Sequence, residues 1–148
     1  MRFPLVFMLL LVLTLPAYAW GSLGGDTASV EADQQRMNAV VTATIAPGYT
    51  AYEIETPSGT RVKEFVSTDG HVFAIAWEGP SLPDMRRLLG AYFDRYVNGT
   101  NALGRGASSR VVEEPGFVAY AGGHMRAFVG RAYIPESIPA GVNVADIR

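Results

Sequence analysis

The middle of the chain alternates apolar and polar residues in consecutive short runs, which is the pattern of β-strands with one buried face. The first two runs are Thr50–Thr56 and Thr60–Ser67, and a third lies within residues 70–79. Pro57-Ser58-Gly59 suits a three-residue hairpin loop between the first two runs, and Asp69-Gly70 suits a two-residue type I′ loop before the third. The pattern therefore predicts an antiparallel meander.

The loops also predict which residues lie opposite one another. The first loop places Glu55 opposite Arg61 and Glu53 opposite Lys63, so that two opposite-charge pairs share one face. The second loop places the remaining strand in register, with Arg61 opposite Glu78. The other face is then expected to be apolar and to consist of Ile54, Val62, Val66, Phe73, Ile75 and Trp77.

Residues 82–97 carry apolar side chains at the spacing of three and four that marks one face of a helix. Ser81, followed three residues later by Asp84, resembles a capping box, and Asn98-Gly99 suits a left-handed helix end. We expect this helix to cover the apolar face of the meander. Its Tyr92, Phe93 and Tyr96 stripe is expected to be core.

Weaker patterns flank this centre. A short helix is expected from Asp26 or Thr27 to about Met37, and Val40–Ala46 is open between a strand and a connector. Beyond the long helix, a second hairpin is expected with strands at residues 111–121 and 124–134. Its turn is Gly122-Gly123, and Pro115-Gly116 marks an edge strand or bulge. Residues 135–148 form a wrapping loop.

These elements together predict an α+β fold. The expected architecture is an antiparallel sheet of about five strands, built as meander, helix and hairpin. One long amphipathic helix packs on it, with a short N-terminal helix alongside. Residues 20–148 are expected to form this single domain.

The first residues have the pattern of a signal peptide. Arg2 supplies the positive end, Leu5–Leu15 is an apolar run, and Ala17-Tyr18-Ala19 is an A-x-A cleavage site. The apolar run is too short for a spanning helix, which needs roughly 20 residues. We expect cleavage after Ala19, with residues 1–19 removed, and a periplasmic or secreted bacterial protein. An uncleaved membrane anchor is the alternative.

Composition narrows the function classes. The 148 residues include no cysteine, so disulfides and thiolate metal sites are excluded. The 12 basic and 14 acidic side chains form no basic stripe, which argues against a nucleic-acid partner. The two histidines have no metal-ligand spacing, and phosphate loops, dinucleotide fingerprints and nucleophile elbows are absent from the sequence. We expect no metal and no cofactor.

Several short motifs resemble one uncharacterised family of exported bacterial proteins, catalogued as domain of unknown function 2844. The motifs span nearly all of the chain after Ala19. The resemblance implies export and carries no role for any particular residue. The motifs are Leu23-Gly24-Gly25, residues 56–60 (TPSGT), residues 72–80 (VFAIAWEGP), Leu82-Pro83-Asp84, Leu88-Leu89-Gly90, Tyr92-Phe93, residues 122–128 (GGHMRAF) and residues 130–133 (GRAY).

Two places in the sequence suggest chemistry. The first is the turn Gly122-Gly123-His124-Met125-Arg126, where two glycines permit close approach. Arg126 there, with Arg131 further along the strand, is a candidate to grip an anion, and His124 is a pH-sensitive partner. The alternative is an ordinary Gly-Gly turn with a solvated histidine and a paired arginine.

The second place is Glu64, which the register puts on the apolar face between Tyr52 and Ile75. A carboxyl group there has a raised pKa or a partner, and perturbed carboxyl groups are candidate acids and bases. The leading function is a non-enzymatic envelope module that binds a small anionic ligand, a glycan or a protein partner. The alternative is an envelope hydrolase or isomerase that uses Glu64 or His124.

Overall fold

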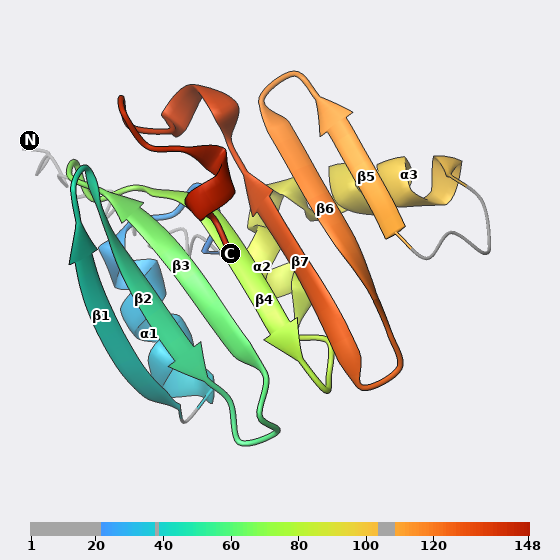
Figure 1. Ribbon diagram of the computed structural model, residues 1–148, viewed down its shortest axis with the longest axis horizontal. Coiled ribbons are helices and arrows are strands. Elements are labelled where there is room, and N and C mark those ends of the chain that lie inside the picture. The colour runs from blue at the N-terminus through green and yellow to red at the C-terminus, as the bar shows by residue number, and fades with distance from the viewer. Residues whose placement is uncertain (1–21, 38, 104–108) are drawn as a thin grey trace, which may run out of the picture.

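The computed structural model describes residues 22–37, 39–103 and 109–148, with the side chain of residue 37 left out (Figure 1). The expected signal peptide, residues 1–19, lies outside the described residues.

One antiparallel sheet dominates the chain. It has seven strands in the order β1-β2-β3-β4-β7-β6-β5, so that a four-stranded meander and a three-stranded meander meet where β4 pairs with β7 (Figure 1). The strands are β1 (Val40–Ala46), β2 (Tyr49–Glu55), β3 (Arg61–Ser67), β4 (Val72–Gly79), β5 (Ser109–Glu114), β6 (Phe117–His124) and β7 (Ala127–Tyr133).

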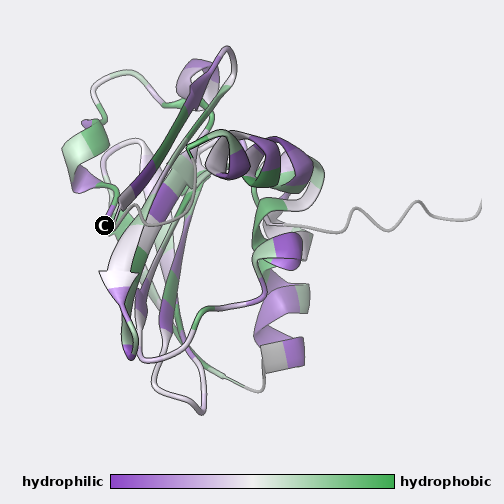
Figure 2. Cartoon of the chain, turned by 90° about the vertical axis from the view of Figure 1, so that its right-hand side faces the viewer, coloured by the Kyte–Doolittle hydropathy of each residue, from purple (hydrophilic) through white to green (hydrophobic). Residues whose placement is uncertain are grey.

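The sheet lies between two unequal layers. The helices α1 (Thr27–Met37), α2 (Met85–Leu89) and α3 (Phe93–Ala102) cover one face, called the inner face below (Figure 2). The C-terminal tail, residues 134–148, lies against the opposite, outer face and contains the short 3₁₀ turns η2 (Pro135–Ser137) and η3 (Val144–Asp146). No helix in the described ranges is long and apolar enough to cross a membrane.

The expected fold class is wrong, because the chain is mostly β, with seven strands where about five were expected. Two local features account for the difference. Val40–Ala46, left open in the sequence, pairs with β2 over its whole length, from Val40 opposite Glu55 to Ala46 opposite Tyr49. Pro115-Gly116 is a turn and not a bulge, because Gly116 has φ 75° and separates β5 from β6.

The register across β2, β3 and β4 is confirmed for most of its length. Glu55 lies opposite Arg61, Glu53 opposite Lys63, and Arg61 opposite Glu78. The two expected β-strands around Pro57-Ser58-Gly59 also form, with Gly59 at φ 82°.

The loop before β4 differs from expectation. Ser67 N donates to His71 O at 2.9 Å, so the loop contains Thr68 as well as Asp69 and Gly70, and only Gly70 has a positive φ. The extra loop residue shifts the pairing by one position, which a bulge at Phe73 takes up. Val66 therefore lies opposite Val72, and Phe73 packs in the outer cluster with Phe65 instead of facing the helices.

The long helix expected over residues 82–97 is interrupted. Gly90 adopts φ 51° and ψ −121°, a conformation open to glycine, and a 3₁₀ turn η1 (Gly90–Tyr92) joins α2 to α3. The N-cap of α2 is Asp84 and not Ser81, with Arg87 N donating to Asp84 Oδ1 at 3.2 Å. The helix α3 ends beyond Gly99, at Ala102.

Two hydrophobic clusters result, one on each face. The inner cluster joins Ile54, Val62, Ile75 and Trp77 of the strands to Leu88 and Leu89 of α2. The outer cluster joins Phe65, Phe73 and Tyr133 to Ile147 of the tail, which is 0% exposed. The outer face, on which the charge pairs were expected, is thus partly covered by the tail, and the candidate site lies beside the covered part.

Candidate functional site

A pocket opens on the outer face where the tail ends its coverage of the sheet. It has a cavity volume of about 550 Å³ and is lined by residues of β3, β4, β5, β6 and β7, with Ile147 and Arg148 of the tail. A cavity of this size is in the range of small-molecule sites. The five strands bring together side chains from residues 61 to 148 that lie far apart in sequence.

Strand register explains why these residues meet. Lys63, Ala76, Arg131 and Tyr120 occupy opposed positions on four successive strands, so their side chains form one row on the outer face. The next row on that face runs from Arg61 through Glu78, Val129 and Gly122 to Ser109. Each row contains one small residue, Ala76 in the first and Gly122 in the second, and these leave room above the sheet.

Arg131 forms one wall of the pocket. Its guanidinium carbon lies 4.9 Å from the centre of the Tyr120 ring, within cation–π distance. Arg131 Nη1 donates to Val144 O and Ile147 O, both at 3.4 Å. Arg131 therefore joins the sheet to the tail while its remaining N–H groups stay available.

Tyr120 is held in place from the other side. Its hydroxyl donates to Glu113 Oε1 at 2.8 Å, and its ring stacks on Tyr133 with centroids 6.5 Å apart. The hydrogen bond to Glu113 raises the pKa of Tyr120 to about 12. The phenol thus remains neutral over the physiological range and offers an aromatic surface beside the Arg131 charge.

Ion pairs neutralise part of the remaining charge. Arg61 pairs with Glu78, and Lys63 Nζ lies 3.3 Å from Glu53 Oε2. Lys63 also donates to Arg148 O at 3.2 Å, which ties β3 to the tail. Glu78 is the one acidic residue among those lining the pocket.

The balance of charge around the pocket is strongly positive. Five cationic residues line it, namely Arg61, Lys63, Arg110, Arg131 and Arg148. Arg110 lies opposite Ala121 and therefore on the inner face of β5, where burial raises the pKa of Tyr96 and the Arg110 charge opposes that rise. No carboxylate of the described chain lies within ion-pair distance of Arg131. The pocket is therefore suited to a negatively charged group.

The structure divides the ligand-binding residues expected from the sequence into two groups. Gly122 and Arg131 line the pocket, whereas Gly123, His124 and Arg126 lie beyond it at the end of the β6–β7 hairpin. The turn is Met125-Arg126 and not Gly122-Gly123, because Arg126 takes the positive φ of 68°. His124 and Arg126 are exposed there.

Glu64 lies on the inner face, as its register predicted, opposite Tyr52 and Ile75. It is 0% exposed, and neither carboxyl oxygen has a hydrogen-bond partner among the described residues. Burial, with a smaller contribution from the Asp33 charge, raises the pKa of Glu64 to about 8. Glu64 is therefore an uncharged acid at neutral pH.

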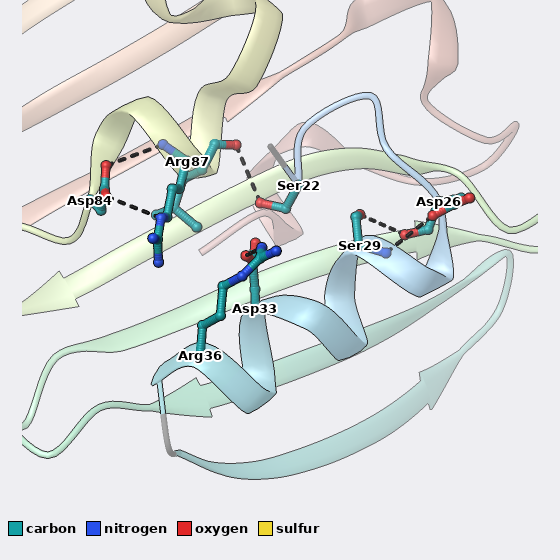
Figure 3. A network of polar contacts seen from close by, with 8 residues as sticks. Ser22, Asp26, Ser29, Asp33, Arg36, Asp84 and Arg87 are labelled. Carbon is teal, nitrogen blue, oxygen red and sulfur yellow. Dashed lines mark hydrogen bonds and ion pairs between the residues drawn. The ribbon is translucent and has the colours of Figure 1, made fainter. Parts of the chain in front are cut away.

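Asp33 of α1 is the second buried carboxyl group on this side, at 5% exposure (Figure 3). Burial raises its pKa, against the opposing charges of Arg36 and Arg87. Arg36 Nη1 lies 3.7 Å from Asp33 Oδ1. This ion pair lies within α1, and Ser22, which precedes the helix, is bound to α2 through its hydroxyl, which donates to Leu88 O at 3.2 Å.

Sequence reasoning missed most of the pocket. Tyr120 and the tail residues Ile147 and Arg148 were not singled out, and Arg61 and Lys63 were expected only as surface ion pairs. The cross-strand register of β2, β3 and β4 put Arg61 and Lys63 on the correct face. The pairing of β4 with β7, which brings Arg131 beside them, has no local pattern in the sequence.

In the described ranges, no group of three or more His, Cys, Asp or Glu side chains is placed to hold a metal ion.

Comparison with curated proteins and with solved structures finds no match to this chain. Residues 19–147 do match a family model described as a protein of unknown function, DUF2844. The match covers nearly the whole chain, and the protein therefore belongs to the DUF2844 family.

Proposed function

We propose that this protein is an exported, non-enzymatic module that binds a small anionic ligand in the outer-face pocket. The observation that carries the proposal is the lining of a cavity of about 550 Å³, in which Arg61, Lys63, Arg131 and Arg148 stand against a single acidic residue, Glu78. Charge-assisted hydrogen bonds from arginine to a carboxylate, phosphate or sulfonate are among the stronger polar contacts in proteins.

The ligand class follows from the groups beside Arg131. Tyr120 offers a neutral aromatic ring, while Val129, which is 50% exposed, adds apolar surface. A ligand with one acidic group and an aromatic or apolar body satisfies both parts of the lining. A bare inorganic anion would leave the apolar part uncovered.

The pocket is tested with the fluorescent probe 1-anilinonaphthalene-8-sulfonate, which joins a sulfonate to an aromatic body. We expect saturable binding to the folded protein, and a loss of about tenfold or more in affinity for Arg131→Gln, because one charge-assisted contact is worth roughly 1.5–3 kcal/mol. Arg131→Lys keeps the charge and is expected to lose less.

Arg126→Gln is the matched control, since Arg126 is an exposed arginine outside the pocket lining. Its affinity for the probe should equal that of the wild type. Equal weakening by Arg126→Gln and Arg131→Gln would indicate a general charge effect and would refute the pocket as the site.

Export is supported by the residues before Trp20, with Arg2, the Leu5–Leu15 apolar run and Ala17-Tyr18-Ala19. The family model also begins its match at residue 19. Native mass spectrometry of protein purified from the host envelope tests both parts of the proposal. We expect a chain that starts at Trp20, accompanied by a small additional mass; an intact residue 1–19 segment would contradict cleavage.

An envelope hydrolase or isomerase remains the alternative, and the geometry favours binding over it. Glu64 is completely buried on the inner face, and His124 is exposed at a hairpin end. Neither residue is among those that line the pocket.

A further inference from the structure

The strand β1 is an edge strand without protection. It pairs with β2 over seven positions with no bulge, and its other side has no strand beside it in the described chain. Its sequence, VVTATIA, contains no charged residue and no proline. Val40 is 77% exposed and Ile45 is 86% exposed. Long, regular, uncharged edges of this kind readily pair with another strand.

The opposite edge of the sheet is built differently. β5 contains Arg110, Glu113 and Glu114, and Glu114 accepts a hydrogen bond from Arg95 of α3 at 2.9 Å. The helix α3 packs closely against β5, with Gly99 next to Val112. Charges and a covering helix are devices that prevent strand addition. β1 has no charged residue and so lacks the first of these devices.

We propose that β1 is a dimerisation surface, on which β1 of a second copy of this chain adds in antiparallel orientation. A two-fold axis through Ala43 places Val41 opposite Ile45 and Thr42 opposite Thr44. Each side of the new pairing thus joins β-branched residues, the pairs that stabilise antiparallel strands. Because β1 contains no charged residue, the pairing brings no like charges together. The edge is therefore complementary to itself.

The faces of the strand agree with this arrangement. Val41 packs against the inner cluster, and Ile45 shares its face by alternation. In the dimer, Ile45 of one copy lies beside Val41 of the other and extends the inner apolar surface across the junction. The two seven-stranded sheets become one continuous sheet, and the pockets stay open because their residues lie on β3 to β7.

Sedimentation velocity over a concentration series tests the proposal. We expect the wild-type chain, residues 20–148, to dissociate reversibly from dimer to monomer, and Ile45→Lys to weaken the dimer at least about tenfold. Thr44→Lys is a second variant with the same expected direction. Met125→Lys is the matched control, because Met125 is 83% exposed on a distant hairpin and its loss should change nothing.

Cross-linking locates the contact. The chain has no cysteine, so Ala43→Cys introduces a single thiol on the proposed axis. A short bis-maleimide is expected to join two copies efficiently, whereas Ala140→Cys, on the tail, is expected to remain unlinked. A wild-type chain that stays monomeric at every concentration overturns the proposal. The proposal is equally overturned if the chain dimerises but Ile45→Lys and Thr44→Lys do not weaken the dimer and Ala43→Cys does not cross-link two copies.

Discussion

At the scale of single residues, two buried carboxyl groups make the stability of this protein depend on pH. Glu64 and Asp33 face the same inner region from β3 and from α1, and each has at least one carboxyl oxygen without a hydrogen-bond partner in the described chain. Ionising Glu64 would place a charge in the apolar interior, so the folded protein holds its proton to a pH of about 8.

The first prediction is a fall in stability with rising pH. In the unfolded chain Glu64 titrates near its ordinary pKa of 4.5, whereas the folded chain keeps the proton to about pH 8. Between these values the folded state binds more protons, so each pH unit lowers the free energy of unfolding by up to about 1.4 kcal/mol. The stabilising contribution of the Glu64 proton to the free energy of unfolding is fully present below pH 4.5 and is lost as the pH rises to about 8. Urea unfolding at several pH values measures it.

Glu64→Gln should abolish most of this slope and be more stable than the wild type at pH 8. Glu31→Gln, which changes an exposed carboxylate of α1, serves as the control and should retain the slope. If Glu64→Gln keeps the wild-type slope, a different group is responsible for the pH dependence.

At the scale of elements, glycines decide how closely the helices approach the sheet. Gly99 lies inside α3, and a Cβ atom there would lie 2.6 Å from Val112 Cγ1 and 2.7 Å from Cγ2. The same principle operates at Gly130, where a Cβ atom would lie 2.2 Å from Trp77 Cζ2. Both glycines serve close packing and not chain reversal.

The second prediction concerns Gly99→Ala. In an exposed helix this change stabilises by roughly 1 kcal/mol, but here the contact with Val112 is expected to reverse the sign and cost about 1–3 kcal/mol. Thermal unfolding measures the change. The double variant Gly99→Ala with Val112→Ala removes the clash and should lose less than the sum of the two single variants. A stabilising Gly99→Ala would show that α3 does not approach β5 this closely.

At the scale of the whole molecule, the tail completes the outer layer and one wall of the pocket. Ile147 is fully buried against the outer cluster, and Arg131 holds the backbone at Val144 and Ile147. The tail therefore joins the stability of the outer face to the shape of the site.

The third prediction is that Ile147→Ala loosens the tail. Removing a buried isoleucine side chain costs about 2–5 kcal/mol when the site cannot collapse. Amide exchange over residues 134–148 should rise, and the affinity for 1-anilinonaphthalene-8-sulfonate should fall. Val142→Ala, a partly buried neighbour, should have a smaller effect. Unchanged exchange in Ile147→Ala would mean that other contacts hold the tail.

The local features of this protein follow from its amino-acid pattern. The family resemblance is confirmed, and so are the short helix from Thr27, the strands around Pro57-Ser58-Gly59 and the Glu53–Lys63 and Arg61–Glu78 pairings. Each of these features depends on periodicity, on turn residues or on pairing across one short loop. All three involve only residues that are close in sequence.

The remaining features depend on contacts between residues that are distant in sequence. Seven strands replaced five because β1 gained a partner in β2 and because Gly116 closed a turn. The helix broke at Gly90 where one continuous helix was expected. The pocket exists because β4 pairs with β7, which brings Arg131 and Tyr120 beside Lys63. That pairing joins residues 49 to 59 positions apart, from Gly79 with Phe128 to Ala74 with Tyr133. Its stability comes from burying two faces at once, a property of the assembled sheet that no local pattern contains.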